Sequence, residues 1–263
     1  MDRNSSLYIV GFAAVVCLVC SVLVSGAAVA LKDRQDVNKV LDQKSKVLSV
    51  AGIITEGQAV SADDIQKLYT ENVTPRLVDL STGAYAEGSA EGYDILKAVK
   101  DPATSKALPR NLAQVPRVPK QAVVYQIGKG GKDGKADMYV LPIFGKGLWS
   151  TMYGFLAVGA DGTTIKGITY YQHGETPGLG GEVDNARWKA LWPGRRIFDD
   201  KGTLAIKVVK GQAGPVAEAP HKVDGLSGAS ITSNGVTFMM QLWLGADGFG
   251  PFLKKIQTGG GAT

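Results

Sequence analysis

The feature that most limits how this chain can fold is an uncharged segment near its N-terminus. No charged residue occurs from Asn4 to Leu31, and the almost wholly apolar part, residues 7–31, is 25 residues long. A helix that crosses a bilayer needs roughly 20 such residues. A cleaved signal peptide is the rival, because Ala28-Val29-Ala30 has the A-x-A form, but the apolar region of a signal peptide runs to only about 7–15 residues. We therefore expect an uncleaved transmembrane helix at 7–31, preceded by a short segment, 1–6.

The bulk composition is that of a globular protein and argues against several function classes. The chain has 263 residues, of which 44% are hydrophobic and 20% charged, with a formal net charge of +5. Because the basic residues are scattered among acidic ones, the charge indicates a mildly cationic surface rather than a nucleic-acid footprint. Two cysteines inside the apolar segment and two histidines do not form a zinc pattern. We predict neither a metal ion nor nucleic acid as a ligand.

Residues 32–120 have the pattern of helices followed by an extended connection. Apolar residues at near-helical spacing predict a stalk helix that begins at residue 32; they are Val37, Val40, Leu41, Val47 and Leu48. Ser61 is a candidate N-cap, and the two aspartates that follow it favour a second helix over 61–72. Four prolines within 99–120 favour extended chain.

Residues 121–256 read mainly as β-structure. The predicted strands are 122–127, 138–144, 152–158, 163–171 and 204–210. Loop 128–135 and the Asp161-Gly162 turn connect hairpins, residues 185–192 form a short helix, and a last helix runs from Ser230 to Leu244. Strands without regular βαβ alternation predict an α+β fold with an antiparallel-rich sheet. Residues 257–263 are expected to be a disordered tail.

The segment DGLSGASITSNG, Asp224–Gly235, gathers four hydroxyl side chains and three glycines before an apolar run. A helix cap would need only one hydroxyl. A nucleophile elbow would need G-x-S-x-G, but Thr232 stands where the last glycine belongs, although His173 and Glu175 are a candidate base and orienter. A helix N-terminus flanked by glycines also suits a phosphate. From these residues alone, all three interpretations remain open.

Two further loops have the composition of a binding site. In YYQHGETPGLGGEV, residues 170–183, a glycine-rich turn exposes amides to the edge of a planar ring. In FGKGLWSTMYG, residues 144–154, Leu148 and Trp149 offer a flat apolar wall, with an ordinary core tryptophan as the alternative. Val183 interrupts the dinucleotide pattern G-x-G-x-x-G, and no Walker motif occurs, which disfavours ordinary nucleotide sites.

The motif DGLSGAS resembles the flavinylation motif of membrane-anchored FMN-binding domains, Asp-Gly-x-Ser/Thr-Gly-Ala-Thr/Ser. Together with HGETPGLGGEV, GKGLWSTMYG and GADGFGPFLKKI, it makes nearly the whole chain similar to the NqrC subunits of the sodium-translocating NADH:quinone reductases. The RnfG subunits of the Rnf electron-transport complexes are the near neighbours, and the C-terminal FGPFLKKI favours the quinone reductase.

The resemblance implies that a dedicated transferase joins FMN, through its phosphate, to the hydroxyl that ends the motif. That residue is Ser230, where threonine is the commoner occupant, and Thr232 is the fallback acceptor. The other expected roles are a phosphate cradle of Ser227, Gly228 and Ala229, a ring wall of Leu148, Trp149, Ser150 and Thr151, contacts from Thr176, Leu179 and Gly180, phosphate neutralisation by Lys207, and transferase recognition through Asp224 and Gly225.

The resemblance also implies a single-pass subunit of the bacterial inner membrane with a periplasmic FMN domain. It would relay electrons singly between redox centres of the complex, while the NADH and quinone sites lie on other subunits, so no catalytic residue is assigned here. The implied partners are those subunits, the flavin transferase and membrane lipid. An Rnf-type subunit, an assembly subunit without flavin and a serine hydrolase are the alternatives.

Overall fold

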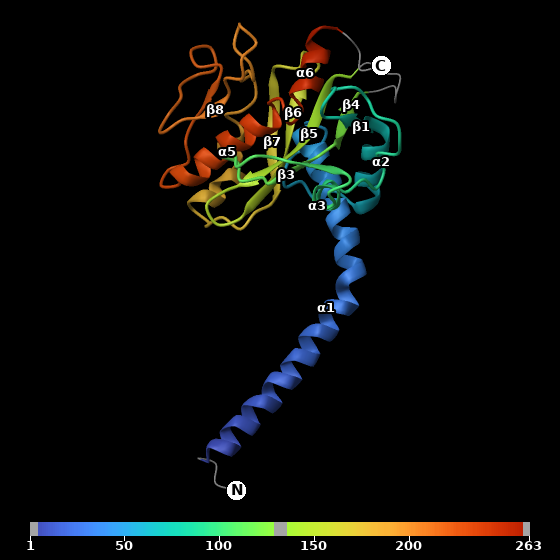
Figure 1. Cartoon of the computed structure of the whole chain (residues 1–263), viewed down its shortest axis with the longest axis vertical. Coiled ribbons are helices and arrows are strands. Elements are labelled where there is room, and N and C mark those ends of the chain that lie inside the picture. Colours follow the sequence, from blue (N-terminus) through green and yellow to red (C-terminus); the bar gives the residue numbers. More distant parts are fainter. Residues whose placement is uncertain (1–4, 129–135, 260–263) are drawn as a thin grey trace. The chain divides into compact units, whose positions relative to one another are not determined.

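The computed structural model describes residues 5–128 and 136–259 (Figure 1). The chain divides into two units, residues 1–43 and 44–263, and helix α1, Ser6–Val50, contributes to both. With a mean hydropathy of 2.8 over its most apolar 18-residue window, α1 is long and apolar enough to cross a membrane by length and composition. The expected transmembrane segment and stalk form this one helix, because neither glycine nor proline occurs between residues 32 and 50.

A five-stranded antiparallel sheet organises the unit formed by residues 44–263. Its strand order is β1-β4-β5-β6-β7. The strands are β1 (Val73–Asp79), β4 (Gln121–Ile127), β5 (Met138–Lys146), β6 (Thr151–Gly159) and β7 (Ile165–Gln172). The fold is therefore α+β with an antiparallel sheet, as predicted.

Shorter elements surround this sheet. The helices are α2 (Ala62–Asn72), α3 (Ile95–Lys100), the 3-10 turn η2 (Gly180–Asp184), α4 (Ala186–Lys189), α5 (Ser230–Trp243) and α6 (Gly250–Gln257). Two small sheets pair β2 (Ser105–Ala107) with β3 (Arg117–Pro119), and β8 (Lys207–Val208) with β9 (Lys222–Val223).

Several local predictions are confirmed. Ser61 caps α2, since its hydroxyl accepts a hydrogen bond from the Asp64 amide at 3.1 Å. The turn between β6 and β7 closes through the Gly162 amide, which donates to the Gly159 carbonyl at 2.9 Å. The last long helix begins at Ser230, as the hydroxyl-rich segment suggested.

The strand pairing corrects the expected boundary between 32–120 and 121–256. β1 pairs along its whole length with β4, so a cut at 120/121 would divide one sheet. The 99–120 connection also carries β2 and β3, and the strand expected over 204–210 is reduced to β8. Gln257, expected in the tail, ends α6 instead. The loop prediction for 129–135 and the tail prediction for 260–263 lie outside the described residues.

Helix α5 packs across the sheet and thereby positions the hydroxyl-rich segment (Figure 1). The Trp243 indole donates to the Phe144 carbonyl at 2.6 Å, and the two rings lie 4.7 Å apart between centroids. Near the other end of α5, Gly235 lies so close to the Lys146 carbonyl that a Cβ would sit 2.4 Å from its oxygen. The first turn of α5 is consequently held beside the turn that joins β5 to β6.

Candidate functional site

A buried carboxylate joins the three segments that the sequence singled out. Glu175, just after β7, is 5% exposed. Its Oε1 accepts hydrogen bonds from the amides of Trp149 and Ser150, at 2.9 and 3.0 Å. Its Oε2 accepts from the Leu148 amide at 3.1 Å and from the Thr232 hydroxyl at 2.7 Å. We call this arrangement the Glu175 cluster.

The cluster keeps Glu175 ionised without a neighbouring cation in it. Burial alone raises the pKa of this carboxyl, but the Thr232 hydroxyl and then the three amides lower it, and the pKa lies below its ordinary value. Charge-assisted bonds of this kind are roughly twice as strong as those between neutral groups. Glu175 therefore holds the β5–β6 turn against the start of α5.

The first turn of α5 is open to a ligand. Ala229 occupies the N-cap position and makes no side-chain capping bond. Ser230 follows as the first helical residue; it is exposed, and its hydroxyl makes no hydrogen bond within the described residues. The simple interpretation of the segment as a serine cap is therefore wrong. Free amides at a helix N-terminus form a natural site for a phosphate.

The four hydroxyls of the segment divide into two pairs. Thr232 and Ser233 are buried and serve the fold, Thr232 through Glu175 and Ser233 by accepting from the Leu226 amide at 3.0 Å. Ser227 and Ser230 are exposed. The structure thus leaves hydroxyls accessible at the two motif positions, separated by Gly228 and Ala229.

Exposed apolar side chains gather at the same place. Beyond α1, the large hydrophobic residues that are exposed in the described chain are Leu112, Leu148, Trp149, Leu179 and Ile231. All but Leu112 belong to the three segments that Glu175 joins. The Leu179 side chain packs against Gly228, since a Cβ there would lie 2.9 Å from Leu179 Cδ2. An exposed apolar group of this kind marks a ligand or partner site.

The geometry does not favour a serine hydrolase. His173 Nε2 lies 2.8 Å from Asp184 Oδ2, and His173 Nδ1 accepts from the Glu175 amide at 3.2 Å. The Glu175 carboxylate is occupied by the cluster. In the part of the chain that the structure describes, neither side chain hydrogen-bonds to Ser230, so the serine lacks a base.

The other predicted residues have contacts within their own loops, and their roles towards a cofactor stay predictions. The Ser150 hydroxyl accepts from the Gly174 amide at 2.7 Å, so it supports the loop. Thr151 begins β6 and pairs with Lys146, whereas Thr176 holds its own turn through its carbonyl. Gly180 lies beside the Glu175 cluster, since a Cβ added to it would lie 2.6 Å from Thr232 Oγ1.

Among the described residues, Lys207 makes no hydrogen bond or ion pair with the start of α5. It lies exposed on β8, whose Val208 amide donates to the Thr237 hydroxyl at 3.0 Å. Thr237 is seven residues, or about 10 Å, along α5 from Ser230. Lys146 is nearer to the cluster, because its ammonium donates to the Trp149 carbonyl at 3.2 Å. Sequence reasoning missed Lys146, Ile231 and the structural role of Glu175.

Comparisons with known proteins identify the family of the chain. A family model for the FMN-binding domain matches residues 147–245, a range that contains every predicted cofactor residue. The NqrC subunit of the Na(+)-translocating NADH-quinone reductase of Pseudomonas aeruginosa is 47% identical over 251 residues, covering 94% of each chain. The corresponding subunit of Vibrio vulnificus strain YJ016 is 50% identical over 245 residues, covering 92% of each. This chain belongs to the NqrC family.

Solved structures of NqrC subunits have the same fold. The crystal structure of Shewanella oneidensis NqrC matches with a TM-score of 0.73 at 35% identity, over 82% of this chain and 96% of that one. The structure of the same subunit from Parabacteroides distasonis matches with a TM-score of 0.64 at 28% identity, over 85% and 96%. The Rnf-type alternative is not favoured, because the relatives found are subunits of an oxidoreductase complex that translocates sodium.

Proposed function

We propose that this NqrC-family subunit carries FMN covalently on Ser230 and relays electrons within a sodium-translocating NADH-quinone reductase. The observation that carries the proposal is the meeting of an accessible Ser230 hydroxyl, an uncapped helix N-terminus and an exposed apolar group inside an FMN-binding domain. The phosphate, its attachment point and the ring each have a matching feature at this one place.

Ser230 fits the acceptor role better than Thr232. Thr232 is 1% exposed and donates its hydroxyl proton to Glu175. Attachment there would require breaking a bond of the Glu175 cluster and opening the first turn of α5. Ser230 needs neither change, because its hydroxyl is exposed and carries no bond within the described residues.

Different residues of the site would bind the phosphate and the ring of a flavin. Bound FMN supplies the ability to accept and release electrons one at a time. The amides and dipole of the first α5 turn would neutralise its phosphate. Leu148, Trp149 and Leu179 would cover the ring with apolar surface, and the Glu175 cluster would hold these segments at a constant separation.

The proposed setting is the bacterial inner membrane, with the flavin domain on the periplasmic side. The apolar part of α1 supports an anchor in contact with lipid. Membership of the NqrC family supports assembly with the other subunits of a reductase. Attachment of FMN would require a flavin transferase during maturation, because no base reaches Ser230 in the described part of the chain.

Co-expression with a flavin transferase is expected to give a yellow protein whose band fluoresces under ultraviolet light on a denaturing gel. A covalent bond survives denaturation, whereas bound but unattached flavin does not. Intact mass should rise by one FMN less one water. Expression without transferase is the control. A colourless, correctly folded protein in the presence of active transferase would support the assembly role instead.

Asp224 and Gly225 test what the transferase recognises. Asp224 Oδ1 accepts from the Ala213 amide at 2.8 Å, and a Cβ on Gly225 would lie 2.3 Å from the Val209 carbonyl oxygen. Asp224→Asn preserves the accepting oxygen, so we expect unfolding free energy within about 0.5 kcal/mol of wild type but loss of flavin loading. Gly225→Ala should cost about 1–3 kcal/mol through overpacking and lower loading as well.

Thermal melts and gel fluorescence measured on the same preparations separate the change in stability from the change in flavin loading. Normal loading of Asp224→Asn would mean that Asp224 only supports the fold.

A further inference from the structure

A loop outside the flavin segments presents an exposed leucine beside the proposed flavin site. The Ala113 carbonyl accepts a hydrogen bond from the Lys146 amide at 3.0 Å, so loop 108–116 adjoins the start of the β5–β6 turn. Leu112, in this loop, is 66% exposed, as much as Trp149 at 67% in the turn. The exposed apolar surface of the flavin segments therefore continues onto a segment that the cofactor motifs do not include.

The conformation of this loop is fixed by its own contacts. The Asn111 side chain accepts a hydrogen bond from the Val115 amide at 3.2 Å and donates to the Val115 carbonyl at 2.7 Å. Gln114 has a φ of 52°, a left-handed conformation that no other non-glycine residue in the described chain adopts. Ala113 and Val115 are buried, whereas Leu112 is left in water. Backbone strain of this kind is concentrated at functional sites, so the exposure of Leu112 points to a contact with another molecule.

Two cations without an acidic partner accompany the apolar side chains. Arg110 is exposed and forms no ion pair within the described residues. The Lys146 ammonium hydrogen-bonds to a carbonyl and, in the same part of the chain, to no carboxylate. Neither 108–116 nor 145–151 contains an acidic residue. The acidic side chains of the other flavin segments each accept a hydrogen bond from the protein already; they are Glu175, Glu182, Asp184 and Asp224.

The kind of partner follows from the proposed function, on which this inference rests. A flavin held by a phosphoester cannot diffuse to another redox centre, so the centre that exchanges electrons with it has to be brought to this part of the domain. The NqrC relatives of this chain are subunits of an NADH-quinone reductase. The molecule that meets this surface is thus another subunit of the same complex. A positively charged edge beside apolar side chains matches a partner with acidic side chains around an apolar centre.

We propose that loop 108–116 and the β5–β6 turn form one docking surface for another subunit of the reductase, whose contacting face is apolar with acidic side chains at its edge. Leu112 and Trp149 supply the apolar contact. Arg110 and Lys146 attract the acidic edge and orient the partner. The surface acts in electron exchange and not in flavin attachment, because no hydrogen bond in the described chain joins loop 108–116 to the Glu175 cluster or to the first turn of α5.

The test uses the whole reductase complex, purified with a variant of this subunit. Leu112→Ser removes the exposed leucine, and Arg110→Glu reverses the exposed charge. Thermal stability of the subunit and its covalent flavin content should match those of the wild type, because both side chains are exposed and lie outside the Glu175 cluster. The rate of quinone reduction by NADH should fall about 10-fold in each variant, as for a central contact of an interface. Loss of a folded, flavin-loaded variant from the purified complex would support the docking surface equally.

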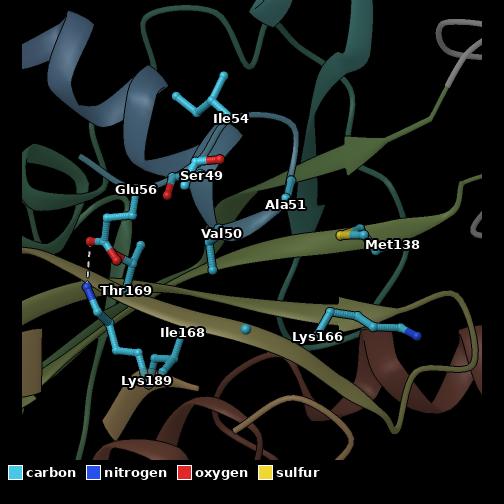
Figure 2. Close-up of a pocket in the computed structure, with 13 residues that line it drawn as sticks. Ser49, Val50, Ala51, Ile54, Glu56, Met138, Lys166, Ile168, Thr169 and Lys189 are labelled. Atoms are coloured by element: carbon cyan, nitrogen blue, oxygen red, sulfur yellow. Dashed lines mark hydrogen bonds and ion pairs between the residues drawn. The ribbon is translucent and has the colours of Figure 1, made fainter. Parts of the chain in front are cut away.

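Three comparisons make the result specific. Leu112→Met keeps a large apolar side chain and should restore the rate. Lys166→Glu is the matched charge reversal and should leave the rate unchanged; Figure 2 shows Lys166 in the pocket beside the end of α1, none of whose lining residues belongs to the docking surface. Added potassium chloride should slow the wild type and partly restore Arg110→Glu, because screening weakens an attraction in the first and a repulsion in the second.

Ser230→Ala separates this proposal from the proposed function. A complex with that variant lacks the covalent flavin, so full quinone reduction by it would refute the electron relay itself. If Ser230→Ala is inactive while Leu112→Ser and Arg110→Glu assemble and work at the wild-type rate, the docking surface is refuted. A folded Leu112→Ser with little covalent flavin would also overturn it, because the loop would then serve the flavin or the transferase. Equal damage by Lys166→Glu would reduce the effect of Arg110→Glu to one of overall charge.

Discussion

Replacing Glu175 with glutamine is expected to lower the free energy of unfolding by about 1–3 kcal/mol and to remove most of the covalent flavin. The carboxylate accepts four hydrogen bonds, two on each oxygen. In the best glutamine orientation, the carbonyl oxygen keeps the amides of Trp149 and Ser150. The new NH2 group can donate to the Thr232 hydroxyl, but it faces the Leu148 amide, donor against donor.

Flavin loading should fall because the Glu175 cluster joins the β5–β6 turn to the first turn of α5. With the Leu148 amide unsatisfied, the β5–β6 turn is no longer fixed against the first turn of α5. Leu148 and Trp149 then lose their position relative to Ser230. Glu175→Ala should be more severe, since it leaves all four donors without their acceptor.

Thermal or urea unfolding and gel fluorescence measure the two effects separately. Glu218→Gln is the matched control, because Glu218 is exposed and lies away from the cluster in the sequence. Full stability and full loading of Glu175→Gln would contradict the clamping role of the carboxylate. Full stability with lost loading would instead indicate that Glu175 meets the flavin or the transferase directly.

The same carboxylate sets a pH dependence whose sign is fixed. Because the folded pKa of Glu175 is below its ordinary value, its contribution to stability is fully present above the unfolded pKa of about 4.3. That contribution is lost as the pH falls through the folded pKa. The stability difference between wild type and Glu175→Gln should therefore be constant near neutral pH and shrink below about pH 4. A difference that grows with acidity would be inconsistent with a lowered pKa.

Local patterns predicted those parts of the fold that local physics decides. Alternation and the Asp161-Gly162 turn indicated the β6–β7 hairpin at one edge of the sheet, and Ser61 marked the start of α2. β1 was missed because Pro75 interrupts its pattern and its partner, β4, begins more than 40 residues later. β1 is an edge strand, where a proline is tolerated.

The sequence analysis assigned no element to the residues that form α6. Its signal is Pro251, because proline is favoured in the first turn of a helix, which is where Pro251 lies. At β8 the sequence predicted too long a strand. The apolar run 204–210 has the composition of a strand but forms only a two-residue parallel pair with β9. Tertiary contacts, which no window of sequence contains, decide such cases.

In the site, too, local patterns predicted some features and tertiary contacts decided the others. The composition of each loop indicated binding, but the proximity of the loops came from the resemblance to known FMN-binding domains. Glu175 and Thr232 lie 57 residues apart, so their hydrogen bond leaves no local trace. An acid between Gly174 and Thr176 was the available signal, and its partners required the fold. For Lys207, the fold places its strand against α5 at Thr237, and its assignment to the phosphate stays a prediction.

Ser230→Ala is expected to abolish the fluorescent band completely, since it removes the atom that forms the bond to phosphorus. Ser230→Thr should retain the band, because a hydroxyl remains at an exposed position and threonine is common at this place in the motif. The α5 helix should form in both variants, because Ser230 makes no hydrogen bond within the described residues. Ser227→Ala is the control at the neighbouring exposed hydroxyl, and it should keep the covalent bond.

Thr232→Val separates attachment from support. The hydroxyl of Thr232 is buried and bonded to Glu175, so its removal should cost about 1–3 kcal/mol and reduce loading in proportion to the loss of folded protein. Peptide mass mapping of the labelled segment would identify the modified residue in each variant. A fluorescent Ser230→Ala together with a dark, folded Thr232→Val would move the acceptor to Thr232. That result would require the first turn of α5 to open during maturation, because Thr232 is closed to a transferase in the folded domain.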